Sequence, residues 1–275
     1  MWVVDRGEYK GQVSAWDRGA QFGDGVFETI LVLNGLPQNF EMHVDRLEKS
    51  FTSLSINNEV DIERYISTTL ADLLSYSGLH SGVLKVLVSR GDSARGYAVP
   101  EGLTSNITLF YSPLPILDET LYRDGVDLKT CNTQCSINPQ MSGMKHLNRL
   151  ENILAKQELG DEYEGLMHNY LGYVVEGTMS NIFFEKDNVL YTPKLDLSGV
   201  EGVMRRSILE ICQENNLNVQ VVDIKLAEVD LFNSAFICNS IIGVLPVNKI
   251  DKNKLSIGVV TKQLQALANK RSNSE

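Results

Sequence analysis

The sequence has few residues of the kinds that build metal sites or disulfide frameworks. Four cysteines and four histidines occur among 275 residues. Cys131 and Cys135 lie close together in sequence, but neither a second cysteine pair nor a histidine spacing completes a zinc site. Cys212 and Cys238 lie in apolar stretches. We therefore expect reduced, partly buried thiols and no bound metal.

Long apolar runs and an excess of basic residues are also missing. No apolar run approaches the roughly 20 residues that cross a bilayer, and no basic segment followed by an apolar one opens the chain. We expect a cytoplasmic protein without a secretory signal or a membrane partner. Lys and Arg number 25 against 35 Asp and Glu, a net charge of −10, which disfavours nucleic acid as a partner. A small anionic ligand would need a local cluster of Arg or Lys.

Three widespread motifs are absent as well. The sequence contains no GxGxxG dinucleotide fingerprint, no GxxxxGK[ST] phosphate loop and no GxSxG nucleophile elbow. His43, His80, His146 and His168 form no metal-ligand spacing. The chemistry must therefore be sought in less common patterns.

Local patterning predicts strands that alternate with helices. Hydrophobic residues make up 43% and charged residues 22%, which is typical of a globular protein. Apolar, β-branched runs predict strands at 25–33, 83–89, 106–112, 126–131, 165–168, 181–184, 189–192, 219–224 and 235–238. Helical spacing predicts helices at 40–54, 60–77, 145–159, with Gly160 as its C-cap, 202–214 and 255–270. The class is α/β or α+β, with antiparallel parts at turns such as Asn34-Gly35.

A domain boundary is expected near residue 115. Pro113 and Pro115 precede a segment, 116–125, that reads as a linker. The chain length suits two domains. We predict a smaller N-terminal α/β domain at 1–115 and a larger C-terminal domain at 126–275.

Two segments have the composition of an anion or ring-binding site. The run Gly199–Arg205 precedes a predicted helix, whose N-terminal N–H groups attract anions, so it could hold one phosphate or be a plain glycine-containing turn. The run Glu176–Asn181 sets one carboxylate among hydroxyl and amide groups. It could hold a protonated ring nitrogen, or be a polar turn between two strands.

Lys145 opens the helix predicted at 145–159. A cation at the first turn of a helix is disfavoured by the helix dipole, and in a closed pocket its pKa would be lowered, which suits Schiff-base chemistry. The alternative is a lysine that faces solvent.

Seven segments together resemble the fold-type IV pyridoxal-phosphate enzymes, which include branched-chain and D-amino-acid aminotransferases and 4-amino-4-deoxychorismate lyase. They occur in the family order and span most of the chain: DRGAQFGDGVFET (17–29), HVDRL (43–47), MKHLNRLENILAKQE (144–158), VEGTMSNIFF (175–184), Thr192-Pro193, GVEGVMR (199–205) and NSIIGVLPV (239–247). The resemblance implies a two-domain fold of the D-amino-acid aminotransferase type, with pyridoxal 5'-phosphate as cofactor and the C-terminal domain as the cofactor-binding one.

The resemblance also assigns roles to single residues. Lys145 is implied as the Schiff-base lysine and Glu176 as the acid that faces the pyridine nitrogen. The phosphate would be held by Arg46, Ser240 and the backbone of Val203 and Met204. Val200 would lie against the ring, and Ser180 and Asn181 would stand near it.

At the level of the reaction, the segment Arg90–Tyr97 (RGDSARGY) is similar to the RGxxxRGY segment of aminodeoxychorismate lyases, as are Lys145–Glu151 and Asn239-Ser240. This implies a lyase that converts an anionic small molecule, 4-amino-4-deoxychorismate, to 4-aminobenzoate and pyruvate in folate biosynthesis. Thr29 is a candidate proton donor, and Arg95 and Tyr97 are candidates for substrate binding. The form GVFETI (25–30) is general to the family, and Leu31 stands close to where some relatives place an Arg or Tyr that contacts the substrate.

Two other functions stay open from the sequence. A D-amino-acid or branched-chain aminotransferase would use the same lysine, and a non-catalytic protein would only carry the cofactor. The family further implies a homodimer, in which the loop at 90–97 of one subunit would complete the site of the other.

Overall fold

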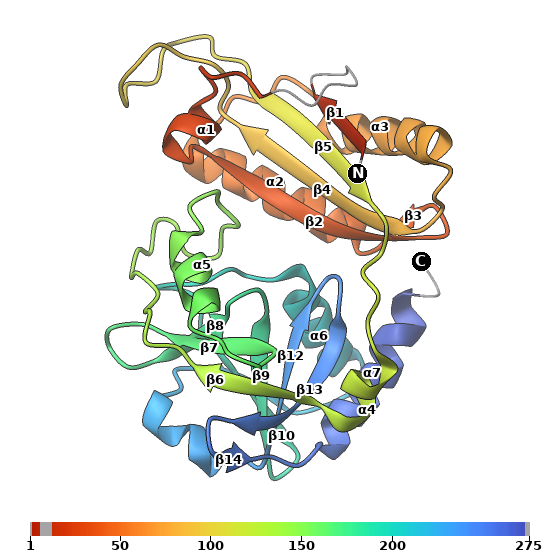
Figure 1. Cartoon of the computed structure of the whole chain (residues 1–275), viewed down its shortest axis with the longest axis vertical. Helices are drawn as coiled ribbons and strands as arrows, with labels where there is room; N and C mark the ends of the chain where they lie inside the picture. The colour runs from red at the N-terminus through yellow and green to blue at the C-terminus, as the bar shows by residue number, and fades with distance from the viewer. Residues whose placement is uncertain (1, 6–12, 273–275) are drawn as a thin grey trace. The chain divides into compact units, whose positions relative to one another are not determined.

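The computed structural model describes residues 2–5 and 13–272, which form two compact units (Figure 1). The first unit comprises Met1–Pro115 and Met144–Asn148, and the second comprises Ile116–Gly143 and Arg149–Glu275. The segment expected to be a linker contains helix α4 (Glu119–Asp124) and belongs to the second unit. The limits of the domains remain a prediction.

The first unit is a five-stranded antiparallel sheet with the strand order β1-β5-β4-β2-β3. Its strands are β1 (Trp2–Asp5), β2 (Gly25–Leu33), β3 (Leu36–Pro37), β4 (Gly82–Ser89) and β5 (Asn106–Ser112), and its helices are α1 (Arg18–Phe22), α2 (Phe40–Leu54) and α3 (Ile62–Ser77). Asn34 and Gly35 both have positive φ angles, 51° and 85°, as the predicted turn between β2 and β3 requires.

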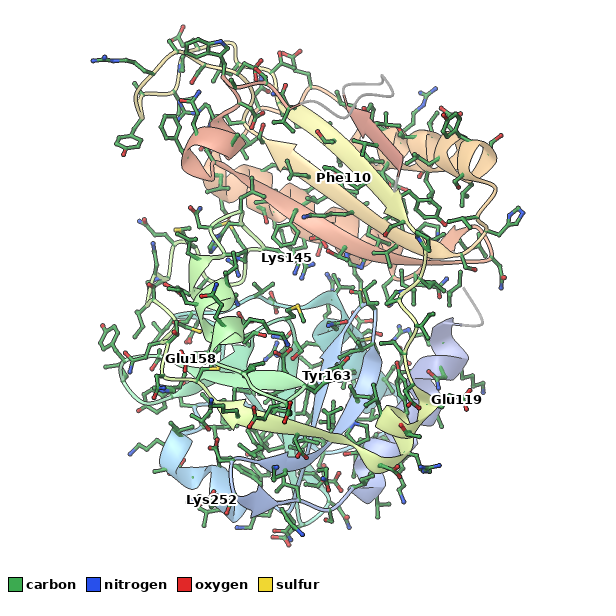
Figure 2. The ribbon with its side chains drawn as sticks, in the orientation of Figure 1. Phe110, Glu119, Lys145, Glu158, Tyr163 and Lys252 are labelled. Carbon is green, nitrogen blue, oxygen red and sulfur yellow. The ribbon has the colours of Figure 1, made fainter. Side chains whose placement is uncertain are left out.

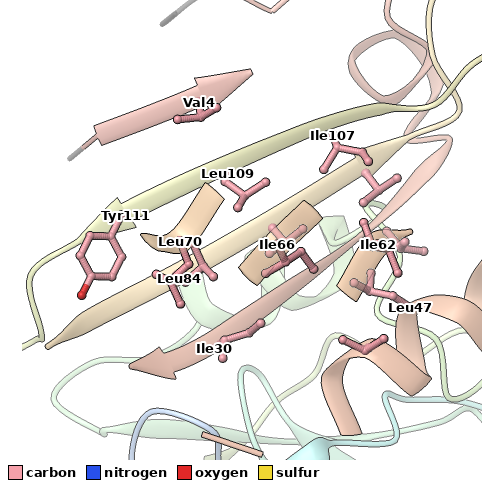
Figure 3. Packing of buried hydrophobic residues seen from close by; sticks show 14 of the residues in the cluster. Val4, Ile30, Leu47, Ile62, Ile66, Leu70, Leu84, Ile107, Leu109 and Tyr111 are labelled. Carbon is pink, nitrogen blue, oxygen red and sulfur yellow. The ribbon is translucent and has the colours of Figure 1, made fainter. Parts of the chain in front are cut away.

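One face of this sheet forms the core of the first unit. Ile30, Leu84 and Leu109 project from β2, β4 and β5 toward Leu47 of α2 and Ile66 of α3, and all five are almost completely buried (Figure 3). Since successive side chains of a strand point to opposite faces, the residues between them lie on the other face of the sheet. That face carries Thr29.

The second unit is a nine-stranded mixed sheet with the order β11-β10-β9-β12-β13-β6-β7-β8, and β14 pairs with β13. Its strands are β6 (Val126–Thr130), β7 (Glu164–His168), β8 (Val174–Gly177), β9 (Asn181–Lys186), β10 (Val189–Pro193), β11 (Val219–Val222), β12 (Ser234–Asn239), β13 (Gly243–Ile250) and β14 (Asn253–Lys254). The remaining helices are α5 (Leu150–Gln157), α6 (Val203–Glu214), the short 3₁₀ helix η1 (Leu226–Leu231) and α7 (Val259–Ser272).

Both faces of the central strands in this unit are buried. Phe183 of β9 stacks on Phe236 of β12 at 4.8 Å, in the cluster that also contains residues of α6 and α7. Their neighbours Ile182 and Ile237 belong to the cluster on the opposite face. A sheet covered on both faces reads as a continuous apolar run, which is why these short strands were recognisable in the sequence.

The helix predicted at 145–159 begins later than expected. Helix α5 starts at Leu150 and its C-cap is Glu158, so Gly160 is not the cap that the sequence suggested. Residues before Leu150 are instead held by strand β2 through long-range hydrogen bonds. Helical spacing of leucines extended the prediction into a segment whose conformation is decided by tertiary pairing.

Some features of the chain were not predicted, and others agree with expectation. Strands β8 and β13 were missed; β13 contains Pro246, a residue usually confined to edge strands, although β13 lies between β12 and β6. All four cysteines are free and buried, and burial raises the pKa of each thiol. In the part of the chain that the structure describes, no helix has the length and hydropathy required to cross a membrane.

Candidate active site

The residues singled out in the sequence are divided between the two units, which we describe one at a time. The first unit contains Thr29, Arg46, Arg95, Tyr97 and Lys145. The second contains Glu176, Ser180, Asn181, Val200, Val203, Met204 and Ser240.

Lys145 lies on an extended segment beside β2, and not at the start of a helix. Its carbonyl accepts a hydrogen bond from the N–H of Phe27 at 2.9 Å, and the N–H of Leu147 donates to Gly25 at 3.0 Å. The Lys145 Nζ atom lies 4.6 Å from the centre of the Phe27 ring. The argument from the helix dipole is therefore wrong, and the lysine is placed by its pairing with β2 instead (Figure 2).

Arg46 is held by a buried carboxylate that the sequence analysis did not select. Glu28 is 1% exposed and lies on the core face of β2. Its carboxylate accepts hydrogen bonds from Arg46 Nε at 2.6 Å and Nη2 at 2.5 Å, and His43 Nδ1 lies 2.6 Å from it. The side-on grip on Nε and Nη2 fixes the plane of the guanidinium and directs Nη1 away from Glu28. A carboxylate in an otherwise apolar strand is the signal that could have revealed it.

Burial and the neighbouring charges shift the pKa of Glu28 in opposite directions. Burial alone raises the pKa of Glu28, but the Arg46 charge and the hydrogen bonds from His43 and Arg46 outweigh it and lower the pKa to about 2. Burial lowers the pKa of His43 more than Glu28 raises it, so the imidazole is neutral at pH 7 and donates its Nδ1–H to Glu28. The charge of Lys145 adds to this lowering, which places the lysine within electrostatic range of His43.

The opposite face of β2 carries Thr29 together with a second lysine. Thr29 pairs in register with Lys85 of β4. The Lys85 Nζ atom lies 5.1 Å from the centre of the Phe27 ring and 6.0 Å from that of Phe110. Lys85 and Lys145 thus lie over the same aromatic ring, which makes this face cationic. The sequence analysis missed Lys85; its place in the alternation of an apolar strand was the available signal.

Arg95 and Tyr97 are not part of this group. They lie on the loop between β4 and β5, where both are exposed and Tyr97 has 84% of its surface accessible. Arg90, at the start of the loop, is buried and its guanidinium binds Asp24 through Nε at 2.8 Å and Nη2 at 3.0 Å. The first arginine of the RGxxxRGY segment therefore anchors the loop, and the second is presented at its surface.

In the second unit, Glu176 and Asn181 hold the backbone of Val200 from two sides. The N–H of Val200 donates to Glu176 Oε2 at 2.9 Å, and its carbonyl accepts from Asn181 Nδ2 at 2.9 Å. Glu176 and Asn181 are each 5% exposed and Val200 is 8% exposed. The structure thus brings together three of the predicted residues, from β8, β9 and the turn before α6. A Cβ at Gly202 would overlap with the Asn181 side chain, so the turn requires glycine there.

Arg149 lies in the electrostatic environment of Glu176. Burial lowers the pKa of Arg149, and the charges of Glu176 and Glu151 oppose this effect. Because a guanidinium remains protonated in any case, Arg149 supplies a positive charge that favours ionised Glu176. It stands in the quoted segment 144–158, but nothing in the pattern distinguished it.

Ser180 is directed toward another buried carboxylate. Its hydroxyl donates to Glu164 Oε2 at 3.0 Å, and the N–H groups of Thr178 and Met179 donate to the same carboxylate at 3.1 and 3.2 Å. Glu164 is 2% exposed and was not selected in the sequence. It fixes the turn at 178–180 between β8 and β9.

The N-terminus of helix α6 lies in the segment that the sequence predicts could hold a phosphate. Its N-cap is Gly202, which has no side chain to accept a hydrogen bond from the first N–H groups of the helix. The first helical residues, Val203 and Met204, have backbone N–H groups without acceptors inside the helix. Ser240 follows β12 and is half-buried. Next to it, Asn239 Oδ1 accepts from the N–H of Ile242 at 2.9 Å and orders this turn.

Comparison with known proteins identifies the family. The chain matches the family model for Amino-transferase class IV over residues 25–250. The chain belongs to this family. The class IV family uses pyridoxal 5'-phosphate, so the predicted cofactor and the predicted α/β fold of fold-type IV are confirmed.

Several class IV relatives are similar over nearly their whole length. The chain is 38% identical to the aminodeoxychorismate lyase of Vibrio harveyi over 92% of this chain and 94% of the relative. It is 31% identical to the D-alanine aminotransferase of Bacillus licheniformis over 90% and 88%. The crystal structure of 4-amino-4-deoxychorismate lyase from Pseudomonas aeruginosa superposes with a TM-score of 0.91 at 35% identity, covering 98% of each chain.

The residues present in each unit fit the cofactor of the class IV family. In the second unit, the α6 end without a side-chain cap suits a phosphate, and a buried carboxylate, Glu176, suits a protonated ring nitrogen. In the first unit, Lys145 supplies a primary amine and Arg46 a preoriented guanidinium. These donor and acceptor types match an anionic phosphate and a pyridinium in charge.

Proposed function

We propose that this protein is a pyridoxal 5'-phosphate-dependent carbon–oxygen lyase that converts 4-amino-4-deoxychorismate to 4-aminobenzoate and pyruvate, a supply of 4-aminobenzoate for folate biosynthesis. The observation that carries the proposal is the loop Arg90–Tyr97. Its sequence resembles the RGxxxRGY segment of the lyases, and the chain is 38% identical to a lyase. The similarity to the Pseudomonas aeruginosa lyase supports it.

The proposed cofactor-binding residues form two groups, one for the anionic phosphate and one for the protonated pyridine ring. Arg46, Ser240 and the N–H groups of Val203 and Met204 would hold the phosphate, since a guanidinium and a helix N-terminus both favour an anion. Glu176 would accept a hydrogen bond from the protonated pyridine nitrogen. Ser180, Asn181 and Val200 would shape the wall beside the ring. When bound, the cofactor withdraws electrons from the carbon that bears the substrate amine.

Two residues of the chain would move protons. Lys145 Nζ would take the proton from the amine-bearing ring carbon of the substrate. The carbon–oxygen bond to the enolpyruvyl group then breaks, and the ring gains aromaticity as the electron pair of the broken carbon–hydrogen bond enters it. The Thr29 hydroxyl would protonate the methylene carbon of the departing enolpyruvate, which completes pyruvate, and the proton taken up by Lys145 would restore the hydroxyl. Arg95 would bind a carboxylate of 4-amino-4-deoxychorismate, and Tyr97 would contact the ring of this substrate.

The first test is the replacement of the lysine. We expect Lys145→Ala to abolish formation of 4-aminobenzoate and the visible absorbance of the holoenzyme, because in this scheme Lys145 supplies both the amine and the base. Lys49→Ala, which removes an exposed lysine paired with Asp45 at 2.8 Å, serves as the control and should retain both. Full activity of Lys145→Ala would overturn the scheme.

An aminotransferase is the second candidate, because the chain is also 31% identical to a D-alanine aminotransferase. The same holoenzyme is supplied with a D- or branched-chain amino acid and 2-oxoglutarate, and glutamate is measured. Glutamate formed at a higher kcat/KM than 4-aminobenzoate would favour the aminotransferase.

We further propose that the protein acts as a homodimer. The exposed position of Tyr97 on a loop with a fixed base supports a role for this loop in contacts with a second copy. In that arrangement the loop Arg90–Tyr97 of one subunit would serve the site of the other.

A further inference from the structure

The loop between β4 and β5 has a base that is fixed by the backbone. The N–H of Arg18 donates to the carbonyl of Gly91 at 2.9 Å, and the N–H of Ser93 donates to Trp16 at 3.1 Å. Gly91 has a φ angle of 108°, and a Cβ there would overlap with the carbonyl oxygen of Thr104. The two ends of the loop therefore lie together, as in a compact Ω-loop.

The guanidinium of Arg18 fills the inside of this loop. Arg18 is 3% exposed, and its two terminal nitrogens donate to four oxygen atoms of the loop. These are Ser93 Oγ at 3.0 Å, the Gly96 carbonyl at 3.2 Å, the Tyr97 carbonyl at 3.1 Å and the Ala98 carbonyl at 3.2 Å. A planar guanidinium has donors in fixed directions, so it determines the direction of three consecutive carbonyls and hence the backbone between them.

Two further residues of the same short helix region hold Arg18 and the loop together. Arg18 Nε donates to Asp24 Oδ2 at 2.8 Å, and its Cζ lies 5.2 Å from the centre of the Phe22 ring. The Phe22 ring meets the Tyr97 ring edge-on at 5.3 Å. Burial raises the pKa of Asp24, but hydrogen bonds from Arg90 and Arg18 and their charges lower it overall, so the carboxylate is ionised.

We propose that Arg18 is a positioning residue for substrate specificity, which fixes the segment from Ser93 to Ala98 so that Arg95 and Tyr97 are presented to a substrate carboxylate in one orientation. This rests on the proposed function, in which Arg95 and Tyr97 contact the substrate. Both side chains are exposed, so the tip of the loop gains little from apolar burial. Its order depends on the hydrogen bonds of Arg18.

The test is Arg18→Lys in the holoenzyme. Lysine keeps the charge, but its three donors sit on one nitrogen and cannot replace the planar guanidinium, which donates to Asp24, Ser93 and three carbonyls. We expect KM for 4-amino-4-deoxychorismate to rise about 10-fold, kcat to change less than about twofold, and the affinity for pyridoxal 5'-phosphate to stay unchanged. Amide hydrogen exchange should become faster at residues 94–99.

The matched control is Arg123→Lys. Arg123 also donates from Nε to an aspartate, Asp124, at 2.7 Å, with a second bond from Nη2 at 2.6 Å, but its side chain is 72% exposed and lies in the second unit. It should leave KM and exchange at 94–99 unchanged. If Arg18→Lys fails to fold, Phe22→Leu removes the ring between Arg18 and Tyr97 while it keeps the guanidinium, and should raise KM in the same way.

A double substitution separates positioning from general stability. If Arg18 acts through the loop, Arg18→Lys should raise KM further by less than about twofold in an Arg95→Ala, Tyr97→Ala background. A full additional increase, or unchanged KM and exchange in Arg18→Lys alone, would overturn the inference. A wild-type enzyme without lyase turnover would instead overturn the proposed function, and the inference with it.

Discussion

Glu28, Glu164 and Glu185 are three buried carboxylates whose charges are compensated in different ways. Glu28 faces the guanidinium of Arg46, whereas Glu164 accepts from backbone N–H and hydroxyl groups. Glu185 accepts from the N–H groups of Val260 and Thr261. A buried carboxylate is costly unless it is paired or fully hydrogen-bonded, so each marks a position where the local geometry is fixed.

The stability of the protein should depend on the ionisation of Glu28 in acid. Its pKa falls from 4.5 to about 2 on folding. A carboxylate with a lowered pKa stabilises the fold above the unfolded pKa and loses this contribution as the pH falls through the folded value. We expect Glu28 to contribute on the order of 3 kcal/mol at neutral pH, lost between pH 4.5 and about 2.

Urea denaturation of wild type and Glu28→Gln at several pH values measures this contribution. The free energy of unfolding of the wild type should fall more steeply over that window than that of the variant. Glu41→Gln, an exposed change at the start of α2, is the control and should follow the wild type. Parallel curves for wild type and Glu28→Gln would contradict the prediction.

At the scale of elements, two helices of the second unit begin in different ways. Helix α7 begins beneath Glu185, which accepts two of its first N–H groups and the Thr261 hydroxyl at 3.1 Å. Helix α6 begins at Gly202 without a side-chain cap. The protein itself therefore satisfies the N-terminus of α7, while the N-terminus of α6 suits a ligand anion.

This contrast predicts a purely structural role for Glu185. Glu185→Ala removes the carboxylate and leaves buried donors without an acceptor, so we expect the free energy of unfolding to fall by about 2 kcal/mol. The affinity for pyridoxal 5'-phosphate should stay within about twofold, because α6 is untouched. Thermal denaturation and a cofactor titration measure the two effects.

The N-cap Asp118 of α4 provides the comparison for Glu185. It accepts from the N–H of Thr120 at 2.8 Å, but this helix is short and exposed. Asp118→Ala should lower the free energy of unfolding less than Glu185→Ala, because water replaces the lost acceptor at an exposed helix end. If Asp118→Ala lowered the free energy of unfolding as much as Glu185→Ala or more, burial of the capping carboxylate would not determine its contribution to stability.

At the scale of the whole molecule, the chain crosses between the two units more than once. It passes into the second unit at Ile116, returns to the first for Met144–Asn148, and re-enters the second at Arg149. Lys145 therefore belongs by its contacts to the first unit, although both sequence neighbours of this segment belong to the second. The segment 144–148 is joined to the second unit at both ends, and hydrogen bonds to Gly25 and Phe27 pair its middle with β2.

The proposed homodimer is the prediction that belongs to this scale. Light scattering of the purified protein should give a mass of roughly 61 kDa, twice the 30.7 kDa of one chain. Dilution through the micromolar range should leave it unchanged if the interface is large and obligate. A mass of 30.7 kDa at every concentration would contradict the dimer, but not the family membership.

Local patterns in the sequence predicted much of the secondary structure. The strand at 25–33 and the helix at 40–54 have the predicted limits, because alternation and helical spacing are set by residues within a few positions of each other. The predicted start of the helix at Lys145 was wrong, since hydrogen bonds to β2, more than a hundred residues away, outweigh the local helical spacing. The segments that resemble the class IV family identified the cofactor for the same reason: each motif is continuous in the chain.

The sequence by itself determined the family, the cofactor and most strands and helices, because these follow from short continuous patterns. Only the tertiary structure decided the partners of the buried charges. Arg18 meets carbonyls almost eighty residues away, and Glu28 meets an arginine on the next helix. Such pairs depend on which strands and loops come together in space, and a charged residue carries no local mark that tells whether it will face water or a buried partner.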